Sequence, residues 1–293
     1  MKVLFVINPI AGRHRSQSII PIIKEKMKNK DIEYKIITTK APKDAVSITK
    51  YGLKSGFNII TAVGGDGTIN EVATGILSVG HGTLGIIQGG TGNDLAKTLN
   101  IPKEPHKAID LILKGKTKVI DIGSVNGRPF LNVASIGVDS QIAQNIENIK
   151  KYFRGKTAYT LGFLKTIFSY KHKKLKVKVN NNIIDRKVLL IAIGNSKYYG
   201  GGMEICPDSI IDDGNFDICI VNEMPKYKVV TLFPSVFKGE HLKYKKYVEY
   251  FRVKSLEIEV LDKAYLNLDG ETYPISEKLL FSIYNKKLNV ICN

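Results

Sequence analysis

The sequence predicts an α/β N-terminal domain with a parallel sheet, followed by a β-rich second domain that forms an antiparallel sandwich. Up to about residue 125, short β-branched apolar runs alternate with helical patterns, which is typical of a parallel sheet with crossover helices. Beyond that point, strand-like runs are separated mainly by turn residues, which favours antiparallel pairing. A chain of 293 residues is long enough for two such domains.

The first domain is expected over residues 1–125, with residues 275–293 packing back on it. Its strands are expected at Val3–Asn8, Glu33–Thr38, Phe57–Val63 and Thr83–Gln88. Its helices are expected from Ser16 or Ser18 to about Lys30, and at Asp44–Ser55, Thr68–Val79, Leu95–Leu99 and His106–Lys114. Ligands of parallel sheets gather at the carboxyl ends of the strands, which places the turns after these strands in one region.

The second domain is expected over residues 126–274. A hairpin of Val119–Val125 and Pro129–Ala134, with its turn at Asn126-Gly127, is expected across the boundary, followed by helices at Ser140–Ile149 and Thr157–Tyr170. Further strands are expected at Leu175–Asn180, Lys187–Gly194, Phe216–Val221, Tyr247–Val253, Leu256–Leu261 and Tyr265–Asp269, with a helix at Pro225–Lys238 and terminal strands at Leu279–Tyr284 and Leu288–Cys292.

A glycine turn from Gly64 to Glu71 joins a buried strand to a helix. Such a turn offers backbone N–H groups and the positive end of a helix dipole, which together bind phosphate. Asp66 stands among these glycines, and a carboxylate repels phosphate unless a cation lies between them. Mg²⁺ suits this position because it binds carboxylates together with substrate phosphates. The turn therefore predicts a nucleoside triphosphate site.

Two familiar phosphate motifs do not fit this turn. The P-loop pattern Gly-x-x-x-x-Gly-Lys-[Ser/Thr] is absent. The chain has its Gly-Lys-Thr ending twice, but the residue five positions earlier, which should be glycine, is Asp110 in one case and Lys150 in the other. The dinucleotide fingerprint fails at its third glycine, where the chain has Asn70, and no acidic residue follows about 20 positions later. A hydride-transfer enzyme is therefore disfavoured.

The net charge of +17 favours an anionic partner: nucleic acid, an anionic membrane surface or a phosphate-rich substrate. A Lys-rich proteome with AT-rich coding is the plainer source of this charge, and the charge alone does not choose between them. The three cysteines are far apart, which predicts neither a disulfide framework nor a metal site and suits a reducing cytoplasm. No run is long enough for a signal peptide core or a membrane span.

The glycine-rich motifs together resemble the diacylglycerol kinase catalytic family, which shares a superfamily with sphingosine kinases and NAD kinases. The motifs that carry the resemblance are Asn8-Pro9-x-Ala11-Gly12, Thr39 with Asp44-Ala45, Gly64-Gly65-Asp66-Gly67-Thr68 with Asn70-Glu71, Gly90-Thr91-Gly92-Asn93-Asp94, Asp213-Gly214 and Asp269-Gly270-Glu271. NAD kinases share Gly-Gly-Asp-Gly-Thr, whereas Asn70-Glu71 and Gly-Thr-Gly-Asn-Asp are similar to the lipid branch. The resemblance extends over essentially the whole chain.

The resemblance implies an ATP- and Mg²⁺-dependent lipid kinase with diacylglycerol as the leading acceptor. It implies Glu271 as general base, and Asp66 with Asp94 and Asp121 in a water-mediated network around the active Mg²⁺. It implies a structural Mg²⁺ at Asp213 and the carbonyls of Ile210 and Asn215. The nucleotide-binding residues it implies are Asn8, Pro9, Ile10, Ala11, Gly12, Thr39, Gly64, Gly65, Gly67, Thr68, Asn70, Glu71 and Thr91.

Plainer interpretations stand beside each of these assignments. Asn93 and Asp94 would also suit a helix cap, Asp269-Gly270 a simple hairpin turn, and the loop before Phe216 needs no metal. NAD kinase and a basic nucleic-acid-binding protein are the alternative functions. The latter leaves the glycine turns unexplained, so no nucleic acid is expected.

The expected location is the cytoplasm, peripheral to the inner face of the membrane. Residues 149–178 mix aromatic and basic side chains, which suits an anionic membrane interface or, equally, a core helix with a solvated lysine face. A second basic run, Lys243–Lys246, would extend such a surface. The sequence leaves open which lipid is the acceptor and whether the protein is a homodimer.

Overall fold

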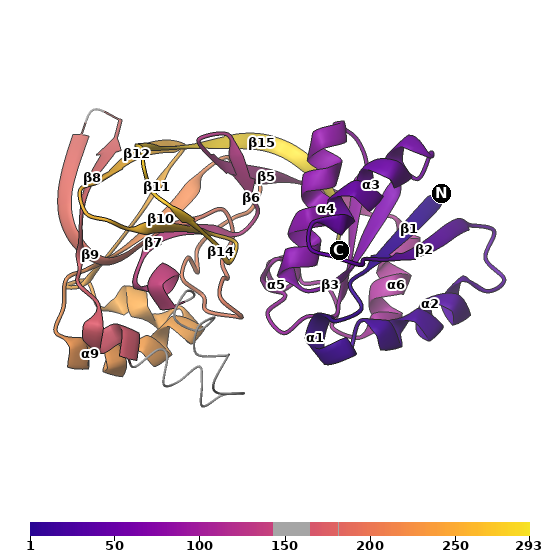
Figure 1. The fold of residues 1–293 in the computed structure, drawn as a ribbon, viewed down its shortest axis with the longest axis horizontal. Coiled ribbons are helices and arrows are strands. Elements are labelled where there is room, and N and C mark those ends of the chain that lie inside the picture. Colours follow the sequence, from indigo (N-terminus) through magenta and orange to yellow (C-terminus); the bar gives the residue numbers. More distant parts are fainter. Residues whose placement is uncertain (143–164, 181) are drawn as a thin grey trace. The chain divides into compact units, whose positions relative to one another are not determined.

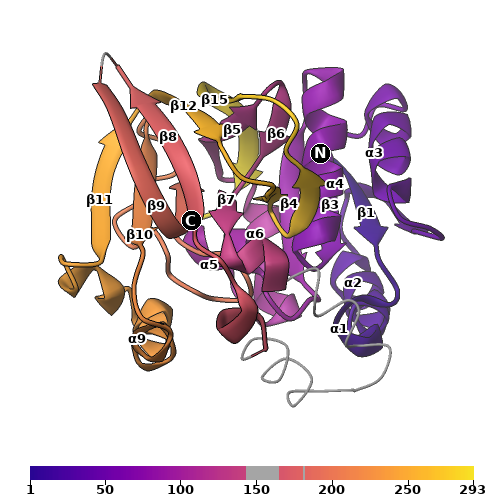
Figure 2. The same ribbon diagram turned by 60° about the vertical axis from the view of Figure 1, so that its left-hand side comes forward.

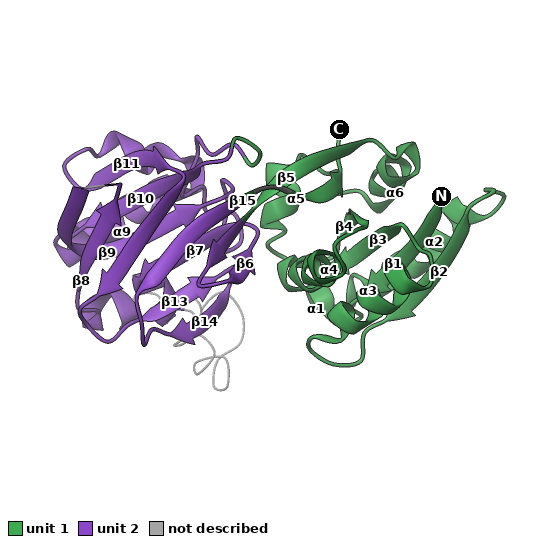
Figure 3. Cartoon of the chain, turned by 90° about the horizontal axis from the view of Figure 1, so that it is seen from above, with its two compact units in different colours: residues 1–122, 211–213, 284–293 green, residues 123–210, 214–283 purple. Residues whose placement is uncertain are grey.

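The computed structural model describes residues 1–142, 165–180 and 182–293. The chain forms two compact units (Figure 3): unit 1 comprises residues 1–122, 211–213 and 284–293, and unit 2 comprises residues 123–210 and 214–283. Two strands, β5 (Thr117–Val125) and β15 (Leu279–Ile291), contribute residues to both units. The sequence pattern predicts a domain boundary near residue 125, and it predicts that the chain packs back on the first domain from residue 275 onwards.

Unit 1 contains the predicted parallel sheet, in the order β15-β4-β3-β1-β2. Besides β15, its strands are β1 (Lys2–Ile7), β2 (Glu33–Thr38), β3 (Ile59–Gly64) and β4 (Thr83–Gln88). The register aligns Ile7 with Thr38 and with Val63, and Gly64 with Gln88. The carboxyl ends of all four strands therefore lie side by side, as the sequence predicts.

Helices cover both faces of this sheet (Figure 1). Helix α3 (Asp44–Lys54) packs on α4 (Asp66–Val79), and α2 (Ile20–Met27) packs on α6 (Pro105–Lys114). The short helices are α1 (Ala11–His14), η1 (Gln17–Ile19) and α5 (Asp94–Thr98). The predicted serine cap is wrong: Ser16 caps neither η1 nor α2, and the Ser18 hydroxyl donates to the Arg15 carbonyl at 2.8 Å.

Unit 2 is the predicted antiparallel β structure (Figure 2). One path runs β14-β13-β7-β9-β8-β12-β15, while β10 joins β9 to β11 and β6 pairs with β5. The remaining strands are β6 (Arg128–Phe130), β7 (Val133–Gly137), β8 (Lys173–Val179), β9 (Asn182–Gly194), β10 (Phe216–Asn222), β11 (Val248–Val253), β12 (Ser255–Val260), β13 (Tyr265–Leu268) and β14 (Glu271–Pro274). The core contains Phe130, which stacks on Phe216 at 5.7 Å and meets Phe281 edge-on at 6.5 Å.

Outside the sheet, unit 2 carries α9 (Lys226–Leu232), η2 (Phe233–Lys238) and η3 (Glu240–Lys243). The predicted helices at 140–149 and 157–170, and the basic stretch 149–178, lie partly outside the described residues, of which 138–142 and 165–169 are helical. Within the described part, Ile167 and Tyr170 are buried in a core cluster with Val138, whereas Phe168 is exposed.

Several predicted strand boundaries in unit 2 are wrong. Strand β9 begins at Asn182 and not at the expected Lys187. The expected strand Pro129–Ala134 is split into β6 and β7, because Leu131 and Asn132 turn their backbone N–H groups toward the Asp269 carboxylate instead of a neighbouring strand. The two expected terminal strands are one continuous strand, β15, which carries the chain from unit 2 into unit 1.

Candidate active site

A cavity of about 410 Å³ lies in unit 1 where the parallel strands end. The turns after β1, β2 and β3 and the glycine turn after β4 contribute its walls. Ten of the predicted nucleotide-binding residues line it: Asn8, Pro9, Ile10, Ala11, Gly12, Thr39, Gly65, Gly67, Thr68 and Glu71. The structure thus brings together residues that are up to 63 positions apart in the sequence.

Three predicted nucleotide-binding residues, Gly64, Asn70 and Thr91, do not line this cavity. The sequence argument missed five residues that do: Lys40, Ala41, Pro42, Ala45 and Gly90. Four of them follow Thr39 closely, and the fifth precedes Thr91. Extending each predicted turn by a few residues would have found them.

The two glycine turns are packed back to back. The Gly64 carbonyl accepts the N–H groups of Gly89 and Gly90 at 2.8 and 3.1 Å. A Cβ at Gly90 would lie 2.3 Å from the Gly65 Cα. Likewise, Gly12 has a φ of 59°, and a Cβ there would lie 2.0 Å from the Gly89 carbonyl oxygen. Backbone contact therefore requires glycine at both positions, and at Gly12 the positive φ requires it as well.

Asp66 joins the two turns through both of its carboxylate oxygens. Oδ1 accepts the N–H of Asp94 at 2.6 Å, and Oδ2 accepts the N–H of Asn93 at 2.7 Å. Burial and the neighbouring Asp94 carboxylate raise the pKa of Asp66, and the backbone hydrogen bonds only partly offset them. Asp66 therefore holds the loop in an environment that still disfavours its ionised form.

Asp94 has a cationic neighbour, Lys97, whose Nζ lies 3.4 Å from Asp94 Oδ1, whereas the Asp66 carboxylate is bound by backbone amides. Asp66 and Asp94 concentrate negative charge beside a helix N-terminus, and both oxygens of Asp66 already accept amides. Over residues 1–142, 165–180 and 182–293, no three acidic, histidine or cysteine side chains are grouped to hold a metal directly. The residues therefore fit a cation held through water and phosphate oxygens rather than in a protein cage.

Asp121 is buried on β5, and its N–H donates to the Ile211 carbonyl at 2.9 Å, which ties residues 211–213 to unit 1. In the same loop, the Asp212 carboxylate pairs with Lys118 at 2.9 Å. The participation of Asp121 in the metal network, and the structural Mg²⁺ at Ile210, Asp213 and Asn215, stay predictions.

Glu71 has a structural task that sequence reasoning missed. Its two oxygens accept the N–H groups of Lys43 and Ala45 at 3.0 and 3.1 Å, at the start of α3. A carboxylate at that position also suits the helix dipole. Glu71 thereby fixes the loop of residues 40–45, which forms one side of the cavity.

In unit 2, Glu271 begins β14 directly after a two-residue hairpin turn. Asp269 and Gly270 have φ angles of 48° and 97°, which matches the type I′ turn that an Asp-Gly pair favours. The Tyr273 hydroxyl donates to Glu271 Oε2 at 2.5 Å, and the Arg128 guanidinium lies 4.7 Å from the Tyr273 ring. Burial and the hydrogen bond to Glu271 raise the pKa of Tyr273 to about 12, so the phenol remains a donor.

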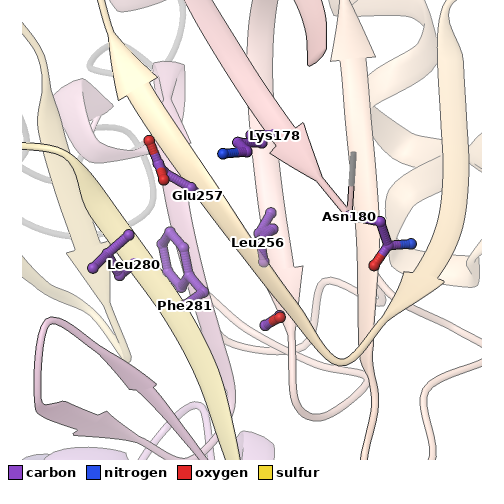
Figure 4. Close-up of a pocket in the computed structure, with 7 residues that line it drawn as sticks. Lys178, Asn180, Leu256, Glu257, Leu280 and Phe281 are labelled. Atoms are coloured by element: carbon purple, nitrogen blue, oxygen red, sulfur yellow. The ribbon is translucent and has the colours of Figure 1, made fainter. Parts of the chain in front are cut away.

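A second cavity of about 310 Å³ lies on unit 2, with Lys178, Asn180, Leu256, Glu257, Leu280 and Phe281 around it (Figure 4). Its acidic residue, Glu257, is paired with Lys278 at 3.2 Å. None of the predicted site residues lines it. The chemistry of the chain is therefore better sought at the strand ends of unit 1 and at the Glu271 hairpin.

Family comparisons match both parts of the chain. Residues 2–125 match the diacylglycerol kinase catalytic domain, and residues 132–292 match the YegS C-terminal NAD kinase beta sandwich-like domain. A diacylglycerol kinase of Bacillus subtilis is 30% identical over 268 residues, which cover 91% of this chain and 88% of that protein. A diacylglycerol kinase of Staphylococcus haemolyticus is 30% identical, with coverage of 91% and 81%.

Solved structures agree with these matches. A "putative diacylglycerol kinase" from Bacillus anthracis str. Sterne is 28% identical, with a TM-score of 0.79 and coverage of 100% of this chain and 95% of that one. Another structure from the same organism, under the same description, is 27% identical with a TM-score of 0.78 and coverage of 100% and 97%.

Proposed function

The chain belongs to the diacylglycerol kinase catalytic family, and from this premise we propose that it transfers the γ-phosphoryl group of ATP to the hydroxyl of diacylglycerol, giving phosphatidate. Membership of the family makes it a phosphotransferase with an alcohol acceptor. The observation that supports ATP as the donor is the cavity at the strand ends, ten of whose lining residues belong to the predicted nucleotide site. Diacylglycerol as the acceptor is supported by the relatives that are named diacylglycerol kinase.

Unit 1 is assigned to the phosphate donor. Helix α4 begins at Asp66, so the amides of Gly67 and Thr68 in its first turn have no partner within the helix and line the cavity. They suit the phosphates of ATP, as does the positive end of a 14-residue helix. The loop of residues 40–45, held by Glu71, supports the opposite wall.

When bound, Mg²⁺ would neutralise the phosphate charge that Asp66 and Asp94 otherwise repel. Asp66 keeps the second glycine turn in place through its two backbone hydrogen bonds. The carboxylate therefore contributes both to the shape of the site and to its charge.

Unit 2 is assigned to the acceptor, with Glu271 as general base. Phosphoryl transfer needs aligned phosphates and a group that accepts the proton of the attacking hydroxyl. The Tyr273 hydroxyl binds Oε2 of Glu271, which leaves Oε1 to accept that proton. The lipid oxygen then forms the bond to the γ-phosphorus, and the bond to the β-phosphate oxygen of ATP breaks.

The test is transfer of labelled phosphate from ATP to a panel of acceptors in mixed micelles, with NAD as a separate soluble acceptor. The panel contains diacylglycerol, a sphingoid base, a monoacylglycerol and a prenol. We expect diacylglycerol to be labelled fastest and Glu271→Gln to lose turnover while still binding nucleotide. The exposed Glu277, also in unit 2, provides the matched control Glu277→Gln, which should keep full activity.

Labelling of NAD without labelling of any lipid would overturn the proposal in favour of a soluble nucleotide acceptor. Near-complete activity of Glu271→Gln would remove the general-base role alone. A different preferred lipid would replace diacylglycerol and leave the kinase assignment intact.

We further propose that the protein acts at the cytoplasmic face of an anionic membrane. Within the described residues, no helix is long and apolar enough to cross a bilayer. Tyr227, Phe237 and Tyr244 are 64%, 49% and 41% exposed and lie in the consecutive elements α9, η2 and η3 or at their ends. Exposed lysines accompany them: Lys226, Lys238, Lys243, Lys245 and Lys246. Aromatic rings among lysines suit the interface of an anionic bilayer.

Co-sedimentation with phosphatidylcholine vesicles, with and without phosphatidylglycerol, tests this surface. We expect binding to the anionic vesicles only, and loss of that binding in the combined variant Tyr227→Ser, Phe237→Ser and Tyr244→Ser. The control is Tyr51→Ser, at a residue of unit 1 that is 54% exposed, and it should bind as the wild type does. Equal binding by the triple variant and the wild type would exclude this surface.

A further inference from the structure

A partly buried carboxylate in unit 2, Asp139, has no task in the reaction described above. It follows β7, and its Oδ2 accepts the hydroxyl hydrogen of Ser135 and an Nδ2 hydrogen of Asn267, the latter at 3.3 Å. Burial raises the pKa of Asp139, and these two hydrogen bonds offset that rise only in part. An ionised carboxylate that is withdrawn from water is costly unless hydrogen bonds or an opposite charge compensate it.

Asn267 connects Asp139 to the hairpin that carries Glu271. Its Nδ2 faces Asp139, and its Oδ1 accepts the N–H of Gly270 at 3.0 Å. A side-chain amide has distinct donor and acceptor ends, and a carboxylate accepts only. Asp139 therefore selects the amide orientation in which the oxygen of Asn267 points to Gly270.

Gly270 immediately precedes Glu271, so this hydrogen bond acts on the backbone of the predicted base. On the other side of the turn, the Asp269 carboxylate accepts the N–H groups of Leu131, Asn132 and Val133. Both residues of the turn are thus fixed to the body of unit 2. The Asp269 attachment is direct, whereas the Gly270 attachment depends on the amide of Asn267.

We propose that Asp139 and Asn267 are positioning residues for phosphoryl transfer: together they hold the Gly270–Glu271 peptide so that the Glu271 carboxylate meets the acceptor hydroxyl. This inference rests on the proposed role of Glu271. A side chain held by its own turn through fixed backbone hydrogen bonds gives the precision that proton transfer requires.

A charge-swap experiment tests the proposal. Asn267→Asp alone sets two carboxylates about 3.3 Å apart, and their repulsion should displace the hairpin. Adding Asp139→Asn restores a complementary pair with the two groups exchanged. The carboxylate, now at position 267, accepts from the Gly270 N–H and from the amide at position 139, which also binds the Ser135 hydroxyl. We expect Asn267→Asp to lower kcat about 100-fold, the loss typical of a misplaced catalytic group, and the double variant to recover most of that loss.

Nucleotide affinity separates positioning from general damage. Because the donor cavity lies in unit 1, the Kd for ADP should be unchanged in both the single and the double variant. Wild-type kcat in Asn267→Asp, or a folded double variant no more active than Asn267→Asp, would overturn the proposal. If Asn267→Asp does not fold, Asn267→Ala decides in its place: a reduced kcat at unchanged ADP affinity supports positioning, and a wild-type kcat contradicts it.

Glu271→Gln, measured in the same series, reports on the proposed function separately. Full activity of Glu271→Gln would show that the base assignment has failed, whatever the swap does. Loss of activity in Glu271→Gln, together with no rescue in the swap, would show that only the positioning inference has failed.

Discussion

The turn that precedes Glu271 allows a clean test of how its hairpin is held. Asp269 accepts three backbone N–H groups: Leu131 at 2.6 Å on Oδ2, and Asn132 and Val133 at 2.8 and 3.2 Å on Oδ1. Asp269→Asn keeps the backbone preference, because asparagine tolerates the positive φ of 48° and Asn-Gly favours the same turn. Only the acceptor chemistry changes.

The magnitude follows from the hydrogen bonds. If the amide oxygen keeps the hydrogen bonds from the Asn132 and Val133 N–H groups, the new NH₂ group faces the Leu131 N–H. Both of these groups are donors, so no hydrogen bond forms between them. Losing one hydrogen bond to a charged acceptor costs about 1.5–3 kcal/mol, and the two that remain weaken because their acceptor is now neutral. We expect a loss of about 3 kcal/mol in the free energy of unfolding. For a unit of this size, that loss lowers Tm by about 6–12 °C.

The assay is thermal unfolding by circular dichroism, with kcat measured in parallel. The control is Asp262→Asn, since the exposed Asp262 accepts a single backbone N–H, from Lys174 at 2.7 Å, and an amide oxygen can replace that acceptor. It should change stability by less than about 0.5 kcal/mol. A Tm for Asp269→Asn as close to wild type as that of Asp262→Asn would refute the reasoning.

Three further predictions address the rest of the site. Glu71→Gln leaves one acceptor for the two amides at the start of α3. The free energy of unfolding of unit 1 should therefore fall by about 1–3 kcal/mol, and the KM for ATP should rise. An unchanged unfolding free energy and an unchanged KM would contradict this. Gly90→Ala puts a Cβ 2.3 Å from the opposite turn, and ATP titration should show at least a roughly tenfold weaker affinity; wild-type affinity would disprove the close contact. Burial, and next the hydrogen bond to Glu271, raises the pKa of Tyr273 from 10.0 to about 12. The stability linked to this shift is complete below pH 10 and is lost as pH rises through 12. NMR of Cζ-labelled tyrosine should show a lower pKa of Tyr273 in Glu271→Gln than in the wild type, and an unchanged pKa would exclude the carboxylate as a cause.

The sequence predicted the parts of the fold that depend on local pattern. Strands β2 and β4 have the predicted bounds. For β4 the reason is that a buried strand in a parallel sheet is a continuous apolar run bounded by turn residues, whereas β2 lies at the edge of the sheet and has no fully buried residue. The sequence also predicted that the glycine turns lie close together, because parallel strands of one sheet end at the same edge. That single rule placed Asn8, Thr39 and Gly65 around one cavity.

What the sequence could not predict are contacts between residues that are distant along the chain. Asp66 accepts amides 27 and 28 positions away, and the break between β6 and β7 depends on Asp269, more than 130 positions further on. A side chain carries no local sign of which amide it will meet. The same holds for Gly12, whose need for a glycine arises from the Gly89 carbonyl.

Three carboxylates, two in unit 1 and one in unit 2, have the same structural role. Asp66, Glu71 and Asp269 each accept two or more backbone N–H groups from another segment. Such bonds favour the ionised form, yet the pKa of Asp66 is raised, because burial and Asp94 outweigh them. The residue that holds the two glycine turns together is therefore also the one that a cation would stabilise most. Its replacement should damage the shape of the donor site and its metal dependence together, so loss of activity alone cannot identify Asp66 as a metal ligand; the dependence of nucleotide affinity on Mg²⁺ concentration can.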